Sequence, residues 1–209
     1  MTVTTTSSTT VKKPIAIVVA ALLPSFGIGH KNALPWRLRQ EMKYFKQLTT
    51  QSTLEEGQLN AVVMGRKTWE SIPIKFRPLP GRINAVVTRS LGDSPTEEER
   101  GGATFYGSVE SALRALSQRQ EVARIFIIGG AEIYRHCLTN GLVDRLFITE
   151  IEHRLEEQLP MDTFLDAHYI KDNFTRASHA QLEKETAMEV AKEVEEGDFR
   201  YKYALYLRK

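Results

Sequence analysis

The chain has 209 residues, of which 42% are hydrophobic and 26% charged, with 28 Lys and Arg against 26 Asp and Glu. Such a length can bury about 70% of the unfolded surface in one core, and the single cysteine, Cys137, excludes a disulfide framework and a multi-cysteine metal site. Basic residues are interspersed with acidic ones, and no stretch approaches the roughly 18 apolar residues of a membrane span, which argues against nucleic-acid and membrane binding.

The chain opens with a segment rich in threonine and serine, from Met1 to Lys13. This segment has no arginine and no apolar core like that of a secretory signal, so it predicts a disordered tail at 1–13 ahead of one domain at 14–209. Because the tail also lacks acidic residues, a mitochondrial fraction is the alternative to a purely cytoplasmic protein. We expect the cytoplasmic location.

Residues 15–23 form a run of branched and small apolar side chains, typical of a strand buried on both faces. After it come Gly27-Ile28-Gly29, a polar stretch and Leu34-Pro35-Trp36, which predict a mobile lid over 24–34 that ends in an apolar plug. An amphipathic helix follows from Leu38. A buried strand, a glycine loop and a helix in this order predict a ligand pocket at the end of the strand.

Glu41 lies where this helix should be apolar. At about 100° per residue, the apolar arc contains Leu38, Met42, Phe45 and Thr49. Glu41 falls inside the arc, next to Phe45. A buried carboxylate without a partner is costly, so its pKa must shift or it must meet a hydrogen-bond donor or a cation. This favours a proton-handling or ligand-orienting acid; a carboxylate at the rim of the arc that turns to solvent is the alternative.

The rest of the chain alternates between strands and helices. Apolar runs predict strands at 61–64, 83–88, 124–128 and 146–151. Helices are expected at 66–72, 108–118 and 131–138, and the last of these holds Cys137 as a small buried side chain. A long hairpin of 175–182 with 199–207 should close the chain around an acidic tip at 183–196. Strands separated by helices imply parallel pairing, with an antiparallel edge at the end.

Two strand-to-helix turns contain glycines that suit phosphate. In Met64-Gly65-Arg66-Lys67-Thr68 and in Ile128-Gly129-Gly130-Ala131-Glu132, a glycine lets the backbone approach a ligand and the next helix offers free N–H groups. Thr88-Arg89-Ser90 places a cation between two hydroxyls, which suits a phosphomonoester. A dinucleotide with one extra phosphate, such as NADPH, would use all three. Each turn alone is a common structural feature, and the fingerprint G-x-G-x-x-G is absent.

Together these residues resemble the dihydrofolate reductase family, the fungal branch in particular. The resemblance runs from about Ile15 to Lys209 and rests on ordered motifs: Gly27-Ile28-Gly29, Leu34-Pro35-Trp36, Glu41 with Tyr44-Phe45-Lys46, and residues 64–73, 76–82 and 127–134. It implies a single-domain α/β fold, with an eight-stranded, mostly parallel sheet, an antiparallel C-terminal hairpin and helices on both faces. It also implies NADPH-dependent reduction of 7,8-dihydrofolate to 5,6,7,8-tetrahydrofolate, which supplies one-carbon carriers for thymidylate, purine and amino-acid synthesis.

Site residues follow from the resemblance, position by position. Four are expected to act in catalysis: Glu41, Trp36, Tyr134 and Thr149. Substrate contacts are expected from Val19, Ala20, Leu34, Glu41, Met42, Phe45, Ser71, Ile72, Leu79, Arg82, Ile128 and Tyr134. Cofactor contacts are expected from Ala21, Ile28, Gly29, Gly65, Arg66, Lys67, Thr68, Thr88, Arg89, Ser90, Gly129, Gly130, Ala131, Glu132, Ile133 and Tyr134.

The resemblance assigns roles to several of these groups. Glu41 would accept hydrogen bonds from the 2-amino group and N3–H of the pterin, while Trp36 and Thr149 hold ordered waters against it. Arg82 would bind the α-carboxylate of the substrate's glutamate as a bidentate fork.

The backbone is also expected to take part. The carbonyls of Val19 and Ile128 would accept hydrogen bonds from a substituent at the 4-position of an inhibitor, and the Gly129–Gly130 peptide bond is expected to be cis. Where vertebrate members place another arginine near the adenosine phosphate, this chain has Gly107.

The resemblance further implies a monomer that binds dihydrofolate and antifolate inhibitors. It implies no metal site, no membrane association and no main function in nucleic-acid binding. Two other functions stay open. One is another NADPH-dependent heterocycle reductase on the same fold, such as the pyrimidine reductase of riboflavin synthesis. The other is a binding protein without turnover that contacts RNA. Glu41, Phe45 and Arg82 suit a pterin substrate with a glutamate tail, which argues against the riboflavin-pathway reductase. An intact Trp36 argues against the binding protein.

Overall fold

The structure is a computed structural model that describes residues 13–51, 55–92, 98–155 and 159–209. Its strands are β1 (Ile15–Leu22), β2 (Gly27–Gly29), β3 (Leu59–Gly65), β4 (Arg82–Val87), β5 (Glu98–Arg100), β6 (Ala103–Tyr106), β7 (Val122–Ile127), β8 (Arg145–His153), β9 (Thr163–Phe164), β10 (Phe174–Arg176), β11 (Val194–Glu196) and β12 (Phe199–Arg208). Its helices are α1 (Arg39–Gln51), α2 (Arg66–Ser71), α3 (Val109–Gln118), α4 (Ala131–Thr139), α5 (Ala167–Asn173) and α6 (His179–Thr186), with short 3-10 turns at Ile74–Phe76 and Arg89–Leu91.

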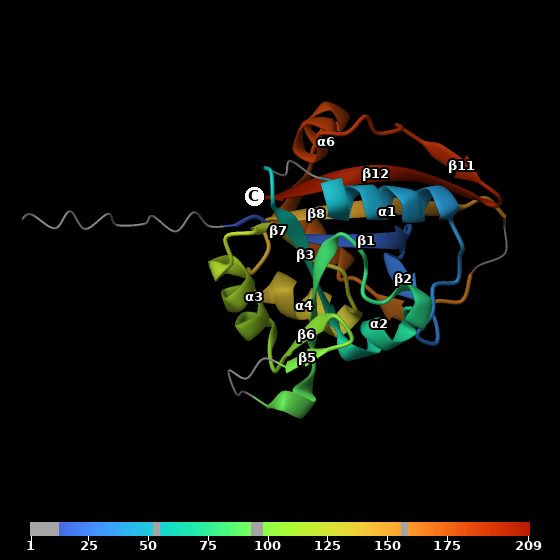
Figure 1. The fold of residues 1–209 in the computed structure, drawn as a ribbon. Helices are drawn as coiled ribbons and strands as arrows, with labels where there is room; N and C mark the ends of the chain where they lie inside the picture. Colours follow the sequence, from blue (N-terminus) through green and yellow to red (C-terminus); the bar gives the residue numbers. More distant parts are fainter. Residues whose placement is uncertain (1–12, 52–54, 93–97, 156–158) are drawn as a thin grey trace, which may run out of the picture.

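One continuous sheet runs through the molecule in the order β10-β12-β8-β1-β7-β3-β4-β6-β5 (Figure 1). The pairs from β8 to β6 are parallel, whereas β12, β10 and β5 pair antiparallel at the two ends. The mostly parallel sheet with an antiparallel C-terminal part is therefore confirmed. Twelve strands are found in the described residues where eight were expected, and five of them, β2, β5, β9, β10 and β11, have only two or three residues.

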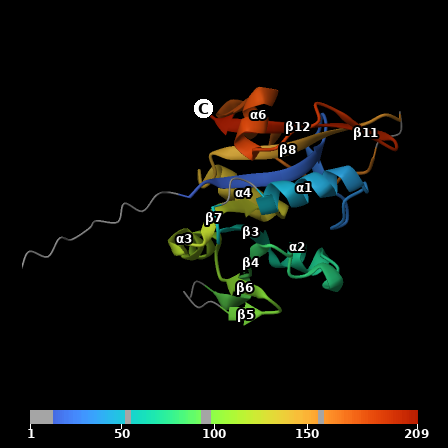
Figure 2. The ribbon, with the colours of Figure 1, turned by 45° about the horizontal axis from the view of Figure 1, so that its top comes forward.

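The strand β1 shows how the sheet separates two cores. Ile17 and Val19 face a cluster that includes side chains of α3, α4 and α5. Ala16 and Val18, at the alternate positions, face a second cluster with side chains of α1, α2 and α6. This period-2 alternation is what a strand buried on both faces requires. Figure 2 shows α2 and α3 on opposite sides of β3 and β4, and the expectation of helices on both faces is confirmed.

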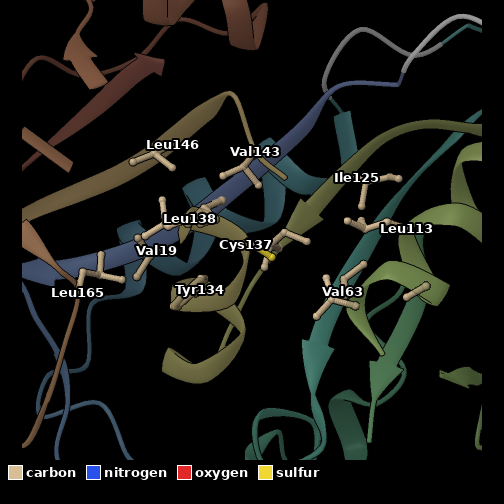
Figure 3. Close-up of a cluster of buried hydrophobic side chains, with 14 of the residues drawn as sticks. Val19, Val63, Leu113, Ile125, Tyr134, Cys137, Leu138, Val143, Leu146 and Leu165 are labelled. Carbon is tan, nitrogen blue, oxygen red and sulfur yellow. The ribbon is translucent and has the colours of Figure 1, made fainter. Parts of the chain in front are cut away.

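Cys137 lies inside the first of these cores. Its side chain is fully buried and packs in the cluster that Figure 3 draws, together with Leu138 and Ile125. Burial raises the pKa of its thiol to about 12, so the thiol stays protonated at neutral pH and behaves as a small apolar group. The expected buried role is confirmed.

The C-terminal region differs from the expected long hairpin. Only residues 174–176 of the first arm form a strand, which pairs with the end of β12. From Ser178 the chain turns into α6, because Ser178 and Gln181 form a capping box in which each side chain accepts from the other's backbone N–H. The tight hairpin is shorter and lies later, between β11 and the start of β12. The acidic segment thus contributes half of α6, a loop and β11.

The glycines at 27–29, expected in a mobile loop, form the short strand β2, which pairs with both β1 and β9. The expected tail lies almost entirely outside the described residues. None of the helices in the described ranges is long and apolar enough to span a membrane.

Candidate active site

The parallel strands bring several expected site residues to one edge of the sheet. The strands β1, β7, β3 and β4 run in the same direction, so their carboxyl ends lie side by side. Gly65 ends β3, Thr88 follows β4, and Gly129 follows β7. Ligands of open α/β sheets bind outside these carboxyl ends. The described residues contain no group of His, Cys, Asp and Glu that could hold a metal ion.

Glu41 is buried in the first turn of α1, with only 7% of its surface exposed. Thr149 of β8 donates to Glu41 Oε1 from Oγ1 at 3.4 Å, and no cation of the described residues pairs with the carboxylate. Burial raises the pKa of Glu41 to about 7, even though the Thr149 hydrogen bond acts against the rise. The alternative of a carboxylate turned to solvent is therefore wrong.

The buried side of α1 is rotated from the expected arc. It contains Glu41, Tyr44, Leu48 and Thr49, whereas Met42 is 53% exposed. The rotation follows from the sheet, because Glu41, Tyr44 and Leu48 repeat at three and four residues and pack on its face. Met42 is therefore not part of the core, and its expected contact with the substrate stays a prediction.

Two tyrosines that were not among the expected site residues, Tyr44 and Tyr203, lie beside Glu41. The rings of Tyr44 and Tyr203 are stacked with their centroids 3.9 Å apart. Burial raises the pKa of both phenols, and the nearby Glu41 carboxylate raises both further. Thr149 pairs with Ala20 on one side and Tyr203 on the other, so the pocket floor is a row across β1, β8 and β12.

Buried polar atoms without partners mark the wall of this pocket. Trp36 is 7% exposed, and its indole N–H has no hydrogen-bond partner among the described residues; the buried hydroxyl of Tyr44 also has none there. Such groups are costly to leave unsatisfied. A hydrogen-bonding ligand or ordered water can satisfy them.

Tyr134 of α4 lies between the middle of β1 and the glycine turn that follows β7. Its hydroxyl donates to the carbonyl of Val18 at 2.9 Å, and the side chain is 5% exposed. The β1 residue whose carbonyl accepts from this tyrosine is thus Val18, which was not among the expected site residues. The side chain of Val19 packs in the same core as Tyr134. The roles of the Val19 and Ile128 carbonyls stay predictions.

Arg82 is a buried cation at the start of β4. Its residue surface is 8% exposed, and its guanidinium donates to Thr49 Oγ1 at 2.8 Å and to the Pro80 carbonyl at 3.2 Å. No carboxylate of the described residues pairs with it, and burial lowers its pKa to about 10. Its guanidinium lies 6.0 Å from the centroid of the Phe45 ring. A buried guanidinium without an anion suits a ligand carboxylate.

Several of the expected apolar contacts are only partly buried. Phe45, Ile72 and Leu79 are partly buried against the core under α1. The large apolar side chains that are exposed in the described residues include Leu34, Met42, Ile74 and Phe76. Ile74 and Phe76 were absent from the expected contacts, although the 76–82 motif contained one of them. Ser71 is exposed at the end of α2.

The two glycine turns contact each other directly. Gly65 N donates to the Gly129 carbonyl at 2.8 Å. A Cβ added to Gly130 would lie 3.3 Å from Thr68 Oγ1, and one added to Gly65 would lie 3.4 Å from Ile133. The N-termini of α2 and α4, including Ala131, thus open onto one space. The Gly129–Gly130 peptide bond is cis, as expected, as are Leu23–Pro24 and Arg77–Pro78.

The expected phosphate cations are exposed and already have acidic neighbours. Arg66 pairs with Glu70 one turn along α2, with Nη1 2.8 Å from Oε1. Arg89 Nη2 lies 3.9 Å from Glu132 Oε2, which places the 88–90 segment beside the first turn of α4. Lys67 is exposed at the start of α2.

Thr88 and Ser90 lie next to Arg89. Their hydroxyl oxygens are 3.0 Å apart, and Thr88 Oγ1 accepts from Ser90 N. The absence of a side chain at position 107 also has a reason, because a Cβ on Gly107 would lie 1.7 Å from the Gly92 carbonyl oxygen. An arginine at 107 would therefore require the 88–92 turn to move.

The lid residues lie at the end of β1. Ala21 and Ile28 are both buried, and Leu22 pairs with Gly27. Gly29 is held at its other side by Thr163 of β9. Backbone groups of β1, β2 and β9 therefore lie together at the carboxyl end of β1.

Comparison with known proteins agrees with this geometry. The family model described as dihydrofolate reductase matches residues 15–196. The dihydrofolate reductase of Candida albicans is 47% identical over 201 residues, which cover 95% of this chain and 99% of that protein. That of Saccharomyces cerevisiae is 38% identical over 210 residues, covering 95% and 98%. The structure of Schistosoma mansoni dihydrofolate reductase superposes with a TM-score of 0.73 at 29% identity, covering 95% of this chain and all of that one.

Proposed function

The chain belongs to the dihydrofolate reductase family, and on that premise we propose that it reduces 7,8-dihydrofolate to 5,6,7,8-tetrahydrofolate with NADPH. The observation that carries the proposal is that the described residues hold both a buried carboxylate without a cationic partner, Glu41, and a buried guanidinium without a carboxylate partner, Arg82. Dihydrofolate has hydrogen-bond donors on its pterin and carboxylates on its glutamate. Each end of the substrate therefore matches one end of the site.

Glu41 is the proton-handling group of this proposal. With a pKa of about 7 it exchanges its proton near neutral pH, and a pKa near the operating pH is what general acid–base catalysis requires. Its carboxylate would accept from the pterin 2-amino group and N3–H. The Trp36 indole N–H and the Thr149 hydroxyl would orient a water between Glu41 and the region of N5.

The residues present fit a dinucleotide with an additional phosphate. Gly65, Gly129 and Gly130 let the two turns pack closely, because an added Cβ would lie only 3.3 to 3.4 Å from a neighbouring side chain. The N-termini of the helices that follow present N–H groups. Arg66, Lys67 and Thr68 would hold the pyrophosphate. When bound, NADPH supplies the hydride.

The 2′-phosphate would lie at the second strand end. Thr88, Arg89 and Ser90 offer two hydroxyls and a guanidinium there, and Glu132 is close enough to hold Arg89 until a phosphate replaces it. Ala21 and Ile28 would offer backbone groups to the nicotinamide carboxamide, and Tyr134 would lie beside its ring. A lid formed by 24–34 would limit the access of water to the reacting atoms.

Apolar side chains fit the rings between the two charged ends. Phe45, Ile72 and Leu79 would enclose the pterin and p-aminobenzoyl groups, with Leu34 and Met42 at the rim. Antifolate inhibitors would use the same surfaces. A cytoplasmic monomer is what the family resemblance predicts for its location and assembly.

A steady-state assay tests the proposal. The purified chain is mixed with NADPH and dihydrofolate, and oxidation of NADPH is followed together with formation of tetrahydrofolate. We expect turnover with dihydrofolate and none with the aminopyrimidine substrate of the riboflavin-pathway reductases. Turnover only with the aminopyrimidine would favour that alternative, and tight binding of dihydrofolate without NADPH oxidation would favour a binding protein.

A further inference from the structure

The helix that holds Glu41 begins without a capping side chain of its own. Trp36, Arg37 and Leu38 precede its first residue, and none of these can accept a hydrogen bond through a side-chain oxygen. The first N–H groups of a helix have no partner inside the helix, and capping them stabilises it. The partners in this protein come from the other end of the chain.

Glu196 of β11 supplies the cap. Its Oε1 accepts from Arg39 N at 2.5 Å, and its Oε2 accepts from Gln40 N at 3.1 Å. The Tyr201 hydroxyl donates to Oε2 at 2.9 Å. Although partial burial acts in the opposite direction, these three hydrogen bonds lower the pKa of Glu196, so this carboxylate is ionised at neutral pH. The hairpin of β11 and β12 fixes its position.

We infer that Glu196 is a positioning residue for the catalytic carboxyl: it fixes the first turn of α1 and, through its negative charge, favours the protonated form of Glu41. The inference rests on the proposed function and extends it to a residue outside the substrate pocket. Glu41 is the third residue of α1, only one position beyond the N–H groups that Glu196 binds.

The physical reason is the charge at the start of the helix. The N-terminus of a helix has a partial positive charge that would favour an ionised Glu41. The carboxylate of Glu196 offsets this charge and repels a second negative charge nearby, and it acts to raise the pKa of Glu41. The surroundings of Glu41 thus combine burial with a fixed anion.

Within the described ranges, no other group around Glu41 can replace this anion. The residues that face Glu41 from α1, α4, β8 and β12 are Tyr44, Tyr134, Thr149 and Tyr203. The pKa values of the three phenols are raised, first by burial, so they are neutral at pH 7. Arg39 is a cation near Glu196, and its charge helps to lower the pKa of Glu196.

The test is Glu196→Gln, with Glu195→Gln as the matched control. Both variants remove one negative charge from β11, but Glu195 is exposed and pairs with Arg154, with 3.1 Å between Oε2 and Nη1. The pKa of Glu41 is measured in the ligand-free protein by NMR of ¹³C-labelled glutamate carboxyls, with the signal assigned by its loss in Glu41→Gln. The pH profile of single-turnover hydride transfer is measured on the same variants.

We expect Glu196→Gln to lower the Glu41 pKa by about half a unit, from the size of charge effects at helix termini, and to move the hydride-transfer profile to lower pH by the same amount. Glu195→Gln should leave both unchanged. Glu196→Asp keeps the charge but moves it back by one methylene, so it should lower the Glu41 pKa by less than Glu196→Gln does. This variant decides the question if Glu196→Gln does not fold.

An unchanged Glu41 pKa in Glu196→Gln, or an equal shift in Glu195→Gln, would overturn the inference. The NMR titration needs no substrate and no cofactor. Failure of the parent chain to reduce dihydrofolate would therefore count against the proposed function alone, and failure of the titration to shift would count against the role of Glu196 alone.

Discussion

The Glu41 pocket and the turns expected to bind phosphate, residues 64–68, 88–90 and 128–132, lie at the same sheet edge but are built in opposite ways. The pocket is buried and holds groups with unmet hydrogen bonds or charge, such as Glu41 and the Trp36 indole. In the turns, Arg66 and Arg89 are exposed and have carboxylate neighbours in Glu70 and Glu132. Exposed ion pairs contribute little to stability, whereas unsatisfied buried groups are costly. The substrate side is therefore preorganised at the expense of stability, while the cofactor side can exchange partners at low cost.

The largest expected effect comes from removing the buried charge. Glu41→Gln should keep the fold and NADPH binding but lower the rate of hydride transfer to dihydrofolate by at least about 100-fold near pH 7, as loss of a positioned proton-handling group does. Single-turnover kinetics with saturating NADPH measure it. The exposed Glu56→Gln is the control and should keep the parent rate. A Glu41→Gln rate within threefold of the parent would remove Glu41 from the mechanism.

The same substitution should raise stability, which sharpens the contrast between the two regions. The folded pKa of Glu41 is about 7 against an ordinary value of 4.5. Between these values the folded state binds a proton that the unfolded state has lost. The stability that this proton contributes is present below about pH 4.5 and is lost as the pH rises to about 7.

Glu41→Gln does not titrate, so relative to the parent it should gain about 2 to 3 kcal/mol in unfolding free energy between pH 4.5 and pH 8. Urea unfolding at several pH values measures the difference. If the difference in unfolding free energy between the two proteins stays constant with pH, then burial does not raise the pKa of Glu41 in the folded state.

The two regions also differ in how much of them the sequence reveals. The phosphate turns are contiguous motifs, so Gly65, Arg66 and the Gly129–Gly130 pair could be found from local spacing alone. The helix period likewise placed Glu41 inward. These features depend on residues only a few positions apart, and the sequence displays them directly.

The rest of the pocket depends on strand register, which a single sequence does not give. Tyr203 lies near Glu41 because β12 pairs with β8, and Val18 in the middle of β1 accepts a hydrogen bond from Tyr134 of α4, 116 residues later in the chain. Glu196 caps a helix that begins 157 residues earlier in the chain. One error was avoidable, because Ser178 with Gln181 three positions later is the sequence pattern of a capping box and marks the start of α6.

The two regions meet at Gly129, which offers a way to disturb both at once. Gly129 has φ +123°, a conformation that side chains rarely adopt, and an added Cβ would lie 3.3 Å from Tyr134 Oη. Gly129→Ala should therefore weaken NADPH and raise the KM for dihydrofolate, each by roughly tenfold, given the usual cost of such strain. Gly57→Ala is the control, because Gly57 also has a positive φ but nothing within 4 Å of its added Cβ. Loss of affinity for only one ligand would contradict a shared wall.

The smallest expected effect is confined to the cofactor side. Arg89 is 90% exposed at its side chain and lies 3.9 Å from Glu132, so Arg89→Ala should cost little stability. The substitution removes a charge-assisted hydrogen bond to the 2′-phosphate, and NADPH binding should weaken about tenfold. NADH lacks that phosphate and should bind almost as before. Arg154→Ala, an exposed arginine paired with Glu195 away from the turns, is the control. Dissociation constants from fluorescence titration measure both cofactors, and equal losses for NADPH and NADH would show that Arg89 does not recognise the 2′-phosphate.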